Sequence, residues 1–223
     1  MNFWYSQMAE GVNTVDTWTE LNDHKNEYMY FRTDHHWTQR GAYYAYTAFA
    51  KAAGFVPHQI SEYTQGKTNG FLGYLYTVTK SSVLKNNPDY VEYFMPKNKS
   101  TMTVYKTPAL INGVKYPVIS SPKASYQMFL AGDQPLCHIV SDTVKNGKTL
   151  LVTKDSFGNA LVPFLTDHFE QIYVIDQREF NTSEAPTLKI VDFAKKHGVT
   201  DILCQASAFN SVNGNTIFKK LLP

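Results

Sequence analysis

The sequence contains an acid and a base two positions apart, in the segment RTDHHWT at residues 32–38. A distant segment, KDSFGN at residues 154–159, contains a serine where an apolar strand pattern gives way to a helix pattern. A serine hydroxyl is a poor nucleophile near neutral pH unless a base lies within reach and a further group orients that base. Asp34, His36 and Ser156 therefore supply the residue types of a nucleophilic hydrolase: an orienting carboxylate, a general base and a nucleophile.

A predicted helix positions the acid and the base. Thr38 is the expected N-cap, apolar residues recur at helical spacing as far as Ala53, and Gly54 is the expected stop. Residues 34–37 then lie in the loop that enters this helix. Because side chains at i and i+2 of an extended segment point the same way, Asp34 is expected to reach the ring of His36 while His35 faces elsewhere.

Strand and helix patterns alternate in the last third of the chain, where the serine lies. Apolar runs at 150–153, 172–175 and 201–204 alternate with helical patterns at 156–168 and 188–197. This alternation predicts an α/β fold with a parallel sheet covered on both faces. Ligands of such sheets bind at the carboxyl ends of the strands, where Ser156 is placed, and the following helix start can stabilise an oxyanion. The alternative is that Ser156 is an N-cap, a role for which Asp155 competes.

The region between these two parts reads as strands and turns. Strands are predicted at 90–94 and 102–105, and the pair Asn112-Gly113 predicts a hairpin between 109–111 and 114–116. We expect one domain in three parts: a helical part of the core with the Asp-His motif at 1–60, a β-rich insertion at 61–146 that forms a lid or a cleft wall, and an α/β part with the nucleophile at 147–223.

A metal site is the main alternative for the first motif. Asp34, His35 and His36 are suitable ligands for zinc, manganese or iron, as in a metal-dependent phosphoesterase. Adjacent histidines rarely reach one ion, however, and the further aspartate motifs of DHH phosphoesterases are not found. We expect no metal and no cofactor. Cys137 and Cys204 have no zinc-ligand spacing and are expected to be buried free thiols.

Composition excludes several classes of partner. The chain has 223 residues, 43% of them hydrophobic and 18% charged, as in an ordinary globular protein. A net charge of +2 without a basic block argues against nucleic acid or an anionic membrane surface. The sequence shows no signal-peptide pattern and no membrane span. The 15 Tyr and 14 Phe residues are expected mainly in the core, and the alternative is that some of the rings stack on sugars.

Several segments together carry a family resemblance. RTDHHWT, followed by GAY at 41–43, resembles the signature of the DHHW family. The segment GKTLLVTKDSFGNALVPFLTDHFEQIYVIDQR at 147–178 is similar to the second block of that family. FLG at 71–73 and FLAG at 129–132 resemble weaker blocks, so the resemblance extends over nearly the whole chain from about residue 13.

This resemblance implies an SGNH-hydrolase-like fold, which is a flavodoxin-like α/β sandwich with a parallel sheet. It also implies kinship with the alginate O-acetyltransferase group, which acts on cell-surface polysaccharide. The implied activity is an O-acetyltransferase or acetylesterase, in which Asp34 orients His36 and His36 activates Ser156. The alternative is a non-catalytic glycan-binding or assembly module of the same fold. A cell-surface glycan and a membrane-bound O-acyltransferase are the implied partners, in the cell envelope or outside the cell.

Further residues are assigned weaker roles through the resemblance. Gly132 and Asn210 are candidates for the oxyanion hole, with a turn and a cap of a helix at 216–222 as the alternatives. Arg178 is a candidate for binding an anionic substrate group, with a structural salt bridge as the favoured alternative. For Trp37 and Arg32, packing and loop anchoring are favoured.

Two departures from the family pattern concern the completeness of the site. Lys154 and Asp155 precede the serine in place of the Gly-Asp of ordinary SGNH serine blocks. Family members also carry a longer segment before the Asp-His motif, so part of the fold or site is expected to be reduced.

Overall fold

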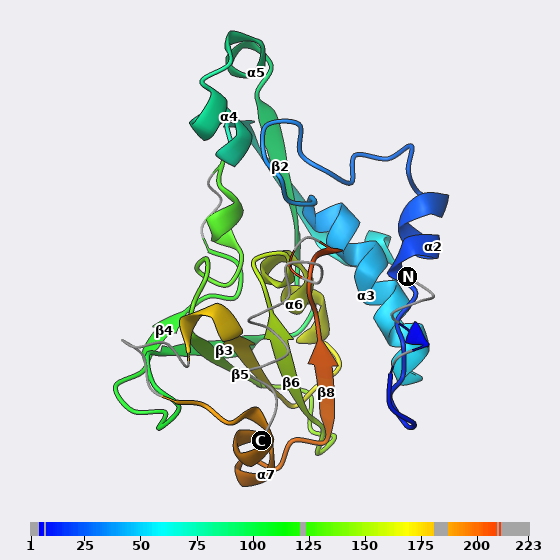
Figure 1. Ribbon diagram of the computed structural model, residues 1–223, viewed down its shortest axis with the longest axis vertical. Coiled ribbons are helices and arrows are strands. Elements are labelled where there is room, and N and C mark those ends of the chain that lie inside the picture. Colours follow the sequence, from blue (N-terminus) through cyan, green and yellow to red (C-terminus); the bar gives the residue numbers. More distant parts are fainter. Residues whose placement is uncertain (1–4, 7, 121–123, 181–186, 209, 211–223) are drawn as a thin grey trace. The chain divides into compact units, whose positions relative to one another are not determined.

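The structure is a computed structural model that describes residues 5–6, 8–120, 124–180, 187–208 and 210 (Figure 1). The chain divides into two compact units, residues 1–94 and 95–223, and each is described by itself. The expectation of a single domain in three parts stays a prediction.

The first unit contains the Asp-His motif. Its elements are α2 (Thr17–Asp23), α3 (Gln39–Ala53), the 3-10 helix η1 (Ile60–Glu62), β1 (Thr64–Phe71), α4 (Tyr74–Thr79), α5 (Ser82–Asn86) and β2 (Asp89–Met95). β1 and β2 form a two-stranded sheet.

Helix α3 begins and ends at the residues that the sequence indicates. The Thr38 hydroxyl caps it by accepting the Gly41 N–H at 3.2 Å. Gly54 ends it in the left-handed conformation with φ 75°, which glycine adopts without steric cost. Nearly all of the helix from residue 39 to residue 50 is buried, so its start is a rigid base for the loop that precedes it. The predicted helix is therefore confirmed.

The second unit contains the serine motif. Its elements are β3 (Ser100–Tyr105), β4 (Val114–Tyr116), η2 (Tyr126–Met128), β5 (Leu136–Ser141), β6 (Thr149–Lys154), α6 (Gly158–Leu165), β7 (Gln171–Asp176), η3 (Gln177–Glu179), α7 (Ile190–Lys196) and β8 (Asp201–Cys204). One six-stranded sheet has the order β4-β3-β5-β7-β6-β8. Figure 1 shows β6 and β8 side by side, with α7 before the start of β8.

The sheet confirms the expected α/β class, but it contains antiparallel as well as parallel strands. β6 is parallel to both β7 and β8, as the alternation of strands and helices predicts. β5 pairs antiparallel with β7, and β3 pairs antiparallel with both β5 and β4, so the whole sheet is mixed. Strands of the expected β-rich insertion thus extend the core sheet, because their hydrogen-bonding edges continue the edge of β7.

The predicted hairpin around Asn112-Gly113 is wrong in its first strand. β4 pairs with β3, with Val104 opposite Val114, and residues 109–111 form no strand. Asn112 does adopt a positive φ of 56°, as its turn propensity suggests, but it lies within a longer connection between β3 and β4. The local signal identified the turn but not the strand that pairs across it.

The central strand β6 and the edge strand β8 differ in how deeply their side chains are buried. Every residue of β6 is buried, since β7 and β8 flank it and both of its faces are covered. β8 is an edge strand, in which Leu203 is buried while Ile202 and Cys204 are exposed. The expectation of two buried thiols is therefore confirmed for Cys137 and wrong for Cys204, because side chains alternate between the faces of a strand.

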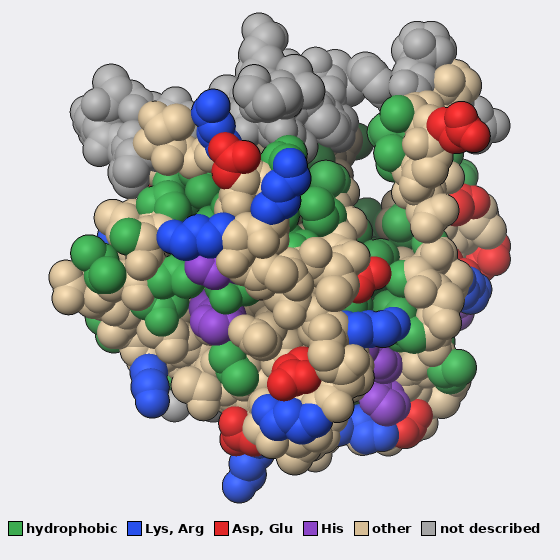
Figure 2. Space-filling view, turned by 90° about the horizontal axis from the view of Figure 1, so that it is seen from below, with side chains coloured by type: hydrophobic (Ala, Val, Ile, Leu, Met, Phe, Trp, Pro, Cys, Tyr) green, Lys and Arg blue, Asp and Glu red, His purple; other side chains and the backbone are tan. Residues whose placement is uncertain are grey.

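Two surface properties bear on partners. On the face drawn in Figure 2, Lys and Arg side chains lie among Asp and Glu side chains rather than in a single block. Within the described ranges, no helix combines the length and the apolar character that a membrane crossing requires.

Candidate active site

The acid and the base of the first motif form a buried pair. His36 Nδ1 lies 2.6 Å from Asp34 Oδ1, and the main-chain N–H of His36 donates to the same oxygen at 2.9 Å. Asp34 Oδ2 accepts the Tyr74 N–H at 2.7 Å. An anionic Asp34 assigns the ring proton of His36 to Nδ1, which leaves the lone pair on Nε2. The predicted reach from Asp34 to His36 is confirmed.

The pKa of Asp34 shows that this carboxylate is held in its charged form. Burial by itself raises the pKa, but the hydrogen bonds from the His36 ring, the Tyr74 N–H and the His36 N–H outweigh it and lower the pKa to about 2. Asp34 is therefore an anion at any pH near neutral. A permanent negative charge beside Nδ1 fixes the orientation of the His36 ring.

The position of His35 differs from the expectation. Its ring centroid lies 4.0 Å from that of His36, and its side chain is 45% exposed. The chain bends throughout residues 32–36, so adjacent rings come together instead of pointing to opposite sides. One ligand atom from each of Asp34, His35 and His36 lies within 4.8 Å of the others, and this spacing would accommodate a metal ion.

A single buried carboxylate holds the loop that carries this pair. Asp89 accepts the Thr33 N–H and hydroxyl, both at 2.7 Å, and the Tyr28 hydroxyl at 2.6 Å. It also accepts the main-chain N–H and the Nε of Arg32, both at 3.0 Å. Burial raises the pKa of Asp89, but the hydrogen bonds from Tyr28 and Thr33 lower it further than burial raises it. These contacts fit the loop-anchoring role favoured for Arg32.

Two glycines around the motif lie so close to neighbouring atoms that neither position has room for a side chain. A Cβ on Gly73 would overlap the Asp34 side chain, and a Cβ on Gly41 would overlap the Met29 carbonyl oxygen. Trp37 is buried, and its Cβ lies against Gly41. The packing role favoured for Trp37 fits this position.

Ser156 lies in the turn between the central strand β6 and helix α6. It is half-buried and comes two residues after the end of β6. Phe157 occupies the N-cap position of α6, so the alternative that Ser156 caps this helix is wrong. The serine is thus at the carboxyl edge of the parallel strands, as the sequence predicts.

Asp155 fixes the turn around this serine. Its side chain is fully buried, and Oδ1 accepts the Phe157 N–H at 3.0 Å. Oδ2 accepts the Ser207 N–H and the Asn210 Nδ2, both at 2.7 Å. Asp155 therefore ties the loop that follows β8 to the turn that follows β6.

The two oxyanion candidates have other partners. Asn210 Nδ2 donates to Asp155, and its proposed role as the cap of a helix at 216–222 lies outside the described residues. Gly132 has a φ of 81°, and its N–H donates to Phe129 O at 3.0 Å. The geometry of Gly132 fits the alternative of a turn residue.

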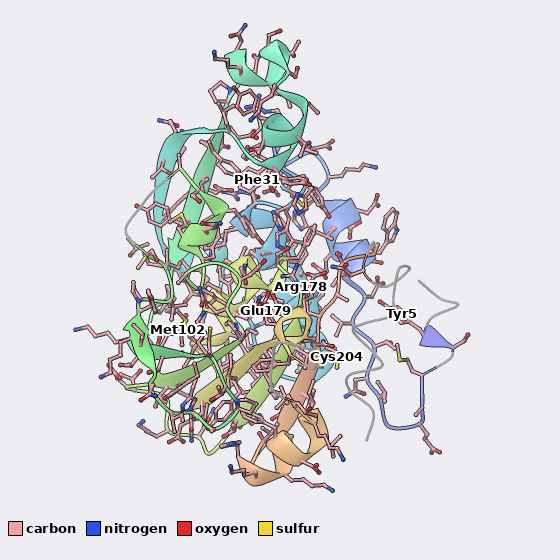
Figure 3. The ribbon with its side chains drawn as sticks, turned by 60° about the vertical axis from the view of Figure 1, so that its left-hand side comes forward. Tyr5, Phe31, Met102, Arg178, Glu179 and Cys204 are labelled. Atoms are coloured by element: carbon pink, nitrogen blue, oxygen red, sulfur yellow. The ribbon has the colours of Figure 1, made fainter. Side chains whose placement is uncertain are left out.

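Arg178 lies in η3, directly after β7 (Figure 3). Its Nε and Nη2 atoms donate to the two oxygens of Asp176 at 2.9 and 2.6 Å. Nη2 also lies 2.9 Å from Asp133 Oδ2. Arg178 thus makes the structural salt bridge that the sequence favoured.

Several contacts of this site were not predicted from the sequence. The buried Lys154 lies 2.9 Å from Asp176 and 3.6 Å from Asp133. Asp133 also accepts Asn159 Nδ2 at 2.8 Å. The sequence did contain a signal for the Lys154–Asp176 pair, because these two residues of opposite charge end two apolar runs that were predicted to be strands of one parallel sheet.

Comparison with known proteins identifies the family. Residues 1–175 match the family described as DHHW protein. The crystal structure of a DHHW family protein from Eubacterium siraeum shares 36% identity and a TM-score of 0.85, over 100% of this chain and 73% of that chain. A structure of Bacillus cereus PatB1 with a sulfonyl adduct shares 22% identity and a TM-score of 0.74, over 94% of this chain and 72% of that chain.

These comparisons confirm the SGNH-hydrolase-like α/β fold class expected from the resemblance. No curated protein sequence matches the chain. The match to the family over residues 1–175 and the 36% identity over the full chain show that this protein belongs to the DHHW family.

Proposed function

We propose that this chain is a serine-dependent acyl-ester enzyme that transfers or removes an acetyl group on a cell-surface glycan. The observation that carries the proposal is the buried pair of Asp34 and His36, with 2.6 Å between Oδ1 and Nδ1. A buried carboxylate that fixes the tautomer of a histidine is the arrangement by which a base activates a hydroxyl nucleophile. Ser156, at the carboxyl edge of the sheet, is the proposed nucleophile.

In the proposed reaction, the Ser156 oxygen attacks the acyl carbonyl carbon while His36 Nε2 takes the hydroxyl proton. The alcohol of the donor ester leaves with that proton, and the acyl group remains on Ser156. A sugar hydroxyl or water then gives its proton to His36 and attacks the acyl carbonyl carbon. The bond from that carbon to the Ser156 oxygen breaks, and His36 passes the proton to this oxygen, which restores the serine. Transferase and esterase differ only in this final acceptor. The N–H groups at the start of α6 are the proposed donors to the oxyanion.

An exposed aromatic surface beside the base supports a sugar as the acceptor. The Tyr74 ring is 56% exposed and meets the His35 ring edge to face, with 5.3 Å between centroids. The Tyr74 N–H is bonded to Asp34, so the ring is held close to the catalytic pair. Pyranose rings present apolar C–H faces that stack on such rings. A membrane-bound O-acyltransferase as the partner that delivers the acetyl group, and a location in the cell envelope or outside the cell, remain part of the proposal.

The test is turnover of p-nitrophenyl acetate by the wild type, Ser156→Ala and His36→Ala. We expect turnover by the wild type and a loss of at least about a thousandfold in each variant, because residues that act as a unit fail together. A sulfonyl fluoride should label Ser156, as judged by mass spectrometry of the peptides, and the label should be absent from Ser156→Ala. Turnover that survives in Ser156→Ala would contradict the proposal.

One observation favours a second candidate, a metal-dependent phosphoesterase. The ligand atoms of Asp34, His35 and His36 lie within 4.8 Å of one another. This candidate predicts turnover of bis-p-nitrophenyl phosphate that disappears with chelator and returns with added Zn²⁺ or Mn²⁺. The serine enzyme predicts acetate-ester turnover that resists chelator. A chain that turns over neither ester but retains glycan affinity would be a binding module.

A further inference from the structure

We infer that Tyr126 positions the proposed nucleophile by holding the peptide group that follows Ser156. This inference rests on the proposed function only in taking Ser156 as the reacting residue. The single proton of the Tyr126 hydroxyl is shared between the carbonyl oxygens of Ser156, at 3.0 Å, and Phe157, at 3.2 Å. Tyr126 is 30 positions away in sequence, so only tertiary structure brings it to this turn.

The peptide group between Ser156 and Phe157 is held at both ends. Its carbonyl oxygen accepts the Tyr126 hydroxyl, and its N–H donates to Asp155 Oδ1 at 3.0 Å. The other oxygen of Asp155 is fixed by the Ser207 N–H and by Asn210. Hydrogen bonds at both the oxygen and the nitrogen restrict the rotation of this peptide plane, and they thereby restrain the backbone that carries the Ser156 side chain.

Tyr126 is itself held in place. It is 6% exposed, and its ring meets Phe129 edge to face, with 5.6 Å between centroids. Its short helix η2 starts from Ser125, whose hydroxyl accepts the Gln127 N–H at 3.2 Å. The phenol oxygen is therefore a fixed point rather than a mobile surface group.

The chain after η2 returns to the same turn. Leu130, Ala131 and Gly132 have φ values of 53°, 57° and 81°, so three successive residues are left-handed and two of them are not glycine. Such residues persist where the surrounding structure determines the backbone. Asp133 follows directly and accepts Asn159 Nδ2 at 2.8 Å, so residues 126–133 contact both sides of the nucleophile turn.

The position of a nucleophile matters far more for rate than for folding. A displacement of about 1 Å in a reacting group lowers a rate by about a hundredfold. Loss of the phenolic hydroxyl should loosen this turn without removing the packed ring, although Ser156 O keeps the Asn159 N–H at 3.2 Å and Asp155 keeps the Phe157 N–H. Tyr126 is accordingly a positioning residue, since it acts through its contact with the backbone of Ser156.

The test compares Tyr126→Phe with Tyr43→Phe. Tyr43 is also 6% exposed, and its hydroxyl also donates to a main-chain carbonyl, that of His58 at 3.1 Å. We expect similar small shifts of Tm in both variants. For p-nitrophenyl acetate and for labelling by a sulfonyl fluoride, Tyr126→Phe should lower kcat and the labelling rate about ten- to hundredfold with little change in KM. Tyr43→Phe should keep both rates within about twofold.

Hydrogen exchange makes the inference testable even if the wild type has no turnover. In Tyr126→Phe, the amides of residues 157–160 should exchange at least about tenfold faster, while those of β7 stay unchanged. If the wild type has no turnover but Tyr126→Phe shows this local change in exchange, the proposed function is contradicted, whereas the role of Tyr126 in holding the Ser156 turn is supported. Unchanged exchange at 157–160, or unchanged kcat in an active enzyme, would overturn the positioning role.

Discussion

Lys154 and Asp176 lie opposite each other at the ends of the parallel strands β6 and β7, with 2.9 Å between Lys154 Nζ and Asp176 Oδ2. Both side chains are buried, and Lys154 comes two residues before the proposed nucleophile. The Arg178 side chain makes two further hydrogen bonds to Asp176, so the carboxylate is shared by two cations. Burial raises the pKa of Asp176, but these cations outweigh burial and lower it.

Replacement of one member of this pair should destabilise the second unit. Lys154→Met leaves Asp176 with Arg178 alone, and we expect a loss of about 3 kcal/mol in the free energy of unfolding. Lys115→Met, on the exposed strand β4, is the matched control and should stay within about 0.5 kcal/mol. Urea denaturation of both variants checks this. Equal stability of the two variants would show that the buried pair makes no net contribution.

The lowered pKa of Asp34 predicts an acid-dependent contribution to stability. The folded-state pKa of about 2 lies below the ordinary value of 3.8, so the stabilisation is present above about pH 4 and is lost as the pH falls through about 2. The full contribution is about 2 kcal/mol. In urea titrations at several pH values, the stability difference between the wild type and Asp34→Asn should be constant above pH 4 and shrink below it. A difference that does not change with pH would contradict the assigned ionisation of Asp34.

The two neighbouring histidines should differ in their effect on turnover. His36 donates to the buried carboxylate, whereas Nδ1 of the more exposed His35 lies 3.9 Å from it. We expect His36→Ala to lose at least about a thousandfold in kcat/KM, and His35→Ala to lose about tenfold or less. Steady-state kinetics with p-nitrophenyl acetate decide this. Equal losses in the two variants would contradict the assignment of the base to His36 rather than His35.

The buried carboxylate of Asp89 should control both folding and activity. Asp89→Ala leaves the hydroxyls and N–H groups of Tyr28, Arg32 and Thr33 without their acceptor, so we expect a loss of about 3 kcal/mol in stability. Asp23→Ala, at an exposed position in the same unit, is the control. Thermal unfolding tests the effect on stability, and ester turnover measured well below the Tm of each variant tests the effect on activity. A folded Asp89→Ala variant with wild-type kcat would show that the Asp-His loop does not depend on this anchor.

The two cysteines should differ in reactivity. Burial raises the pKa of the Cys137 thiol to about 12, whereas Cys204 is exposed on the edge strand. A disulfide reagent at pH 8 should therefore titrate one thiol in the native protein and two in denaturant. Cys204→Ser should abolish the native reaction. Rapid native labelling of Cys137 would contradict the burial of strand β5.

Local patterns were sufficient for the elements that carry the site. The cap at Thr38, the stop at Gly54 and the apolar runs of β6, β7 and β8 each depend on neighbours in sequence, and the structure confirms them. The pairing of Asp34 with His36 could also be predicted, because both belong to one short loop.

Contacts between distant segments could not be predicted in this way. The partner of β4, the return of residues 126–133 to the serine turn, and the five hydrogen bonds on Asp89 each join residues many positions apart. The exposure of Cys204 likewise depends on the place of β8 at the edge of the sheet.

By itself, the sequence determined which side chains are available for chemistry and which short elements carry them, because helix caps and apolar periodicity act over a few residues. Tertiary structure alone decided how those side chains are held: Asp89 and Tyr74 around the acid and base, and, around the serine, Tyr126 and the bond from the Ser207 N–H to Asp155. The reason is that a hydrogen bond depends on distances and angles that sequence spacing fixes only within one loop or one element.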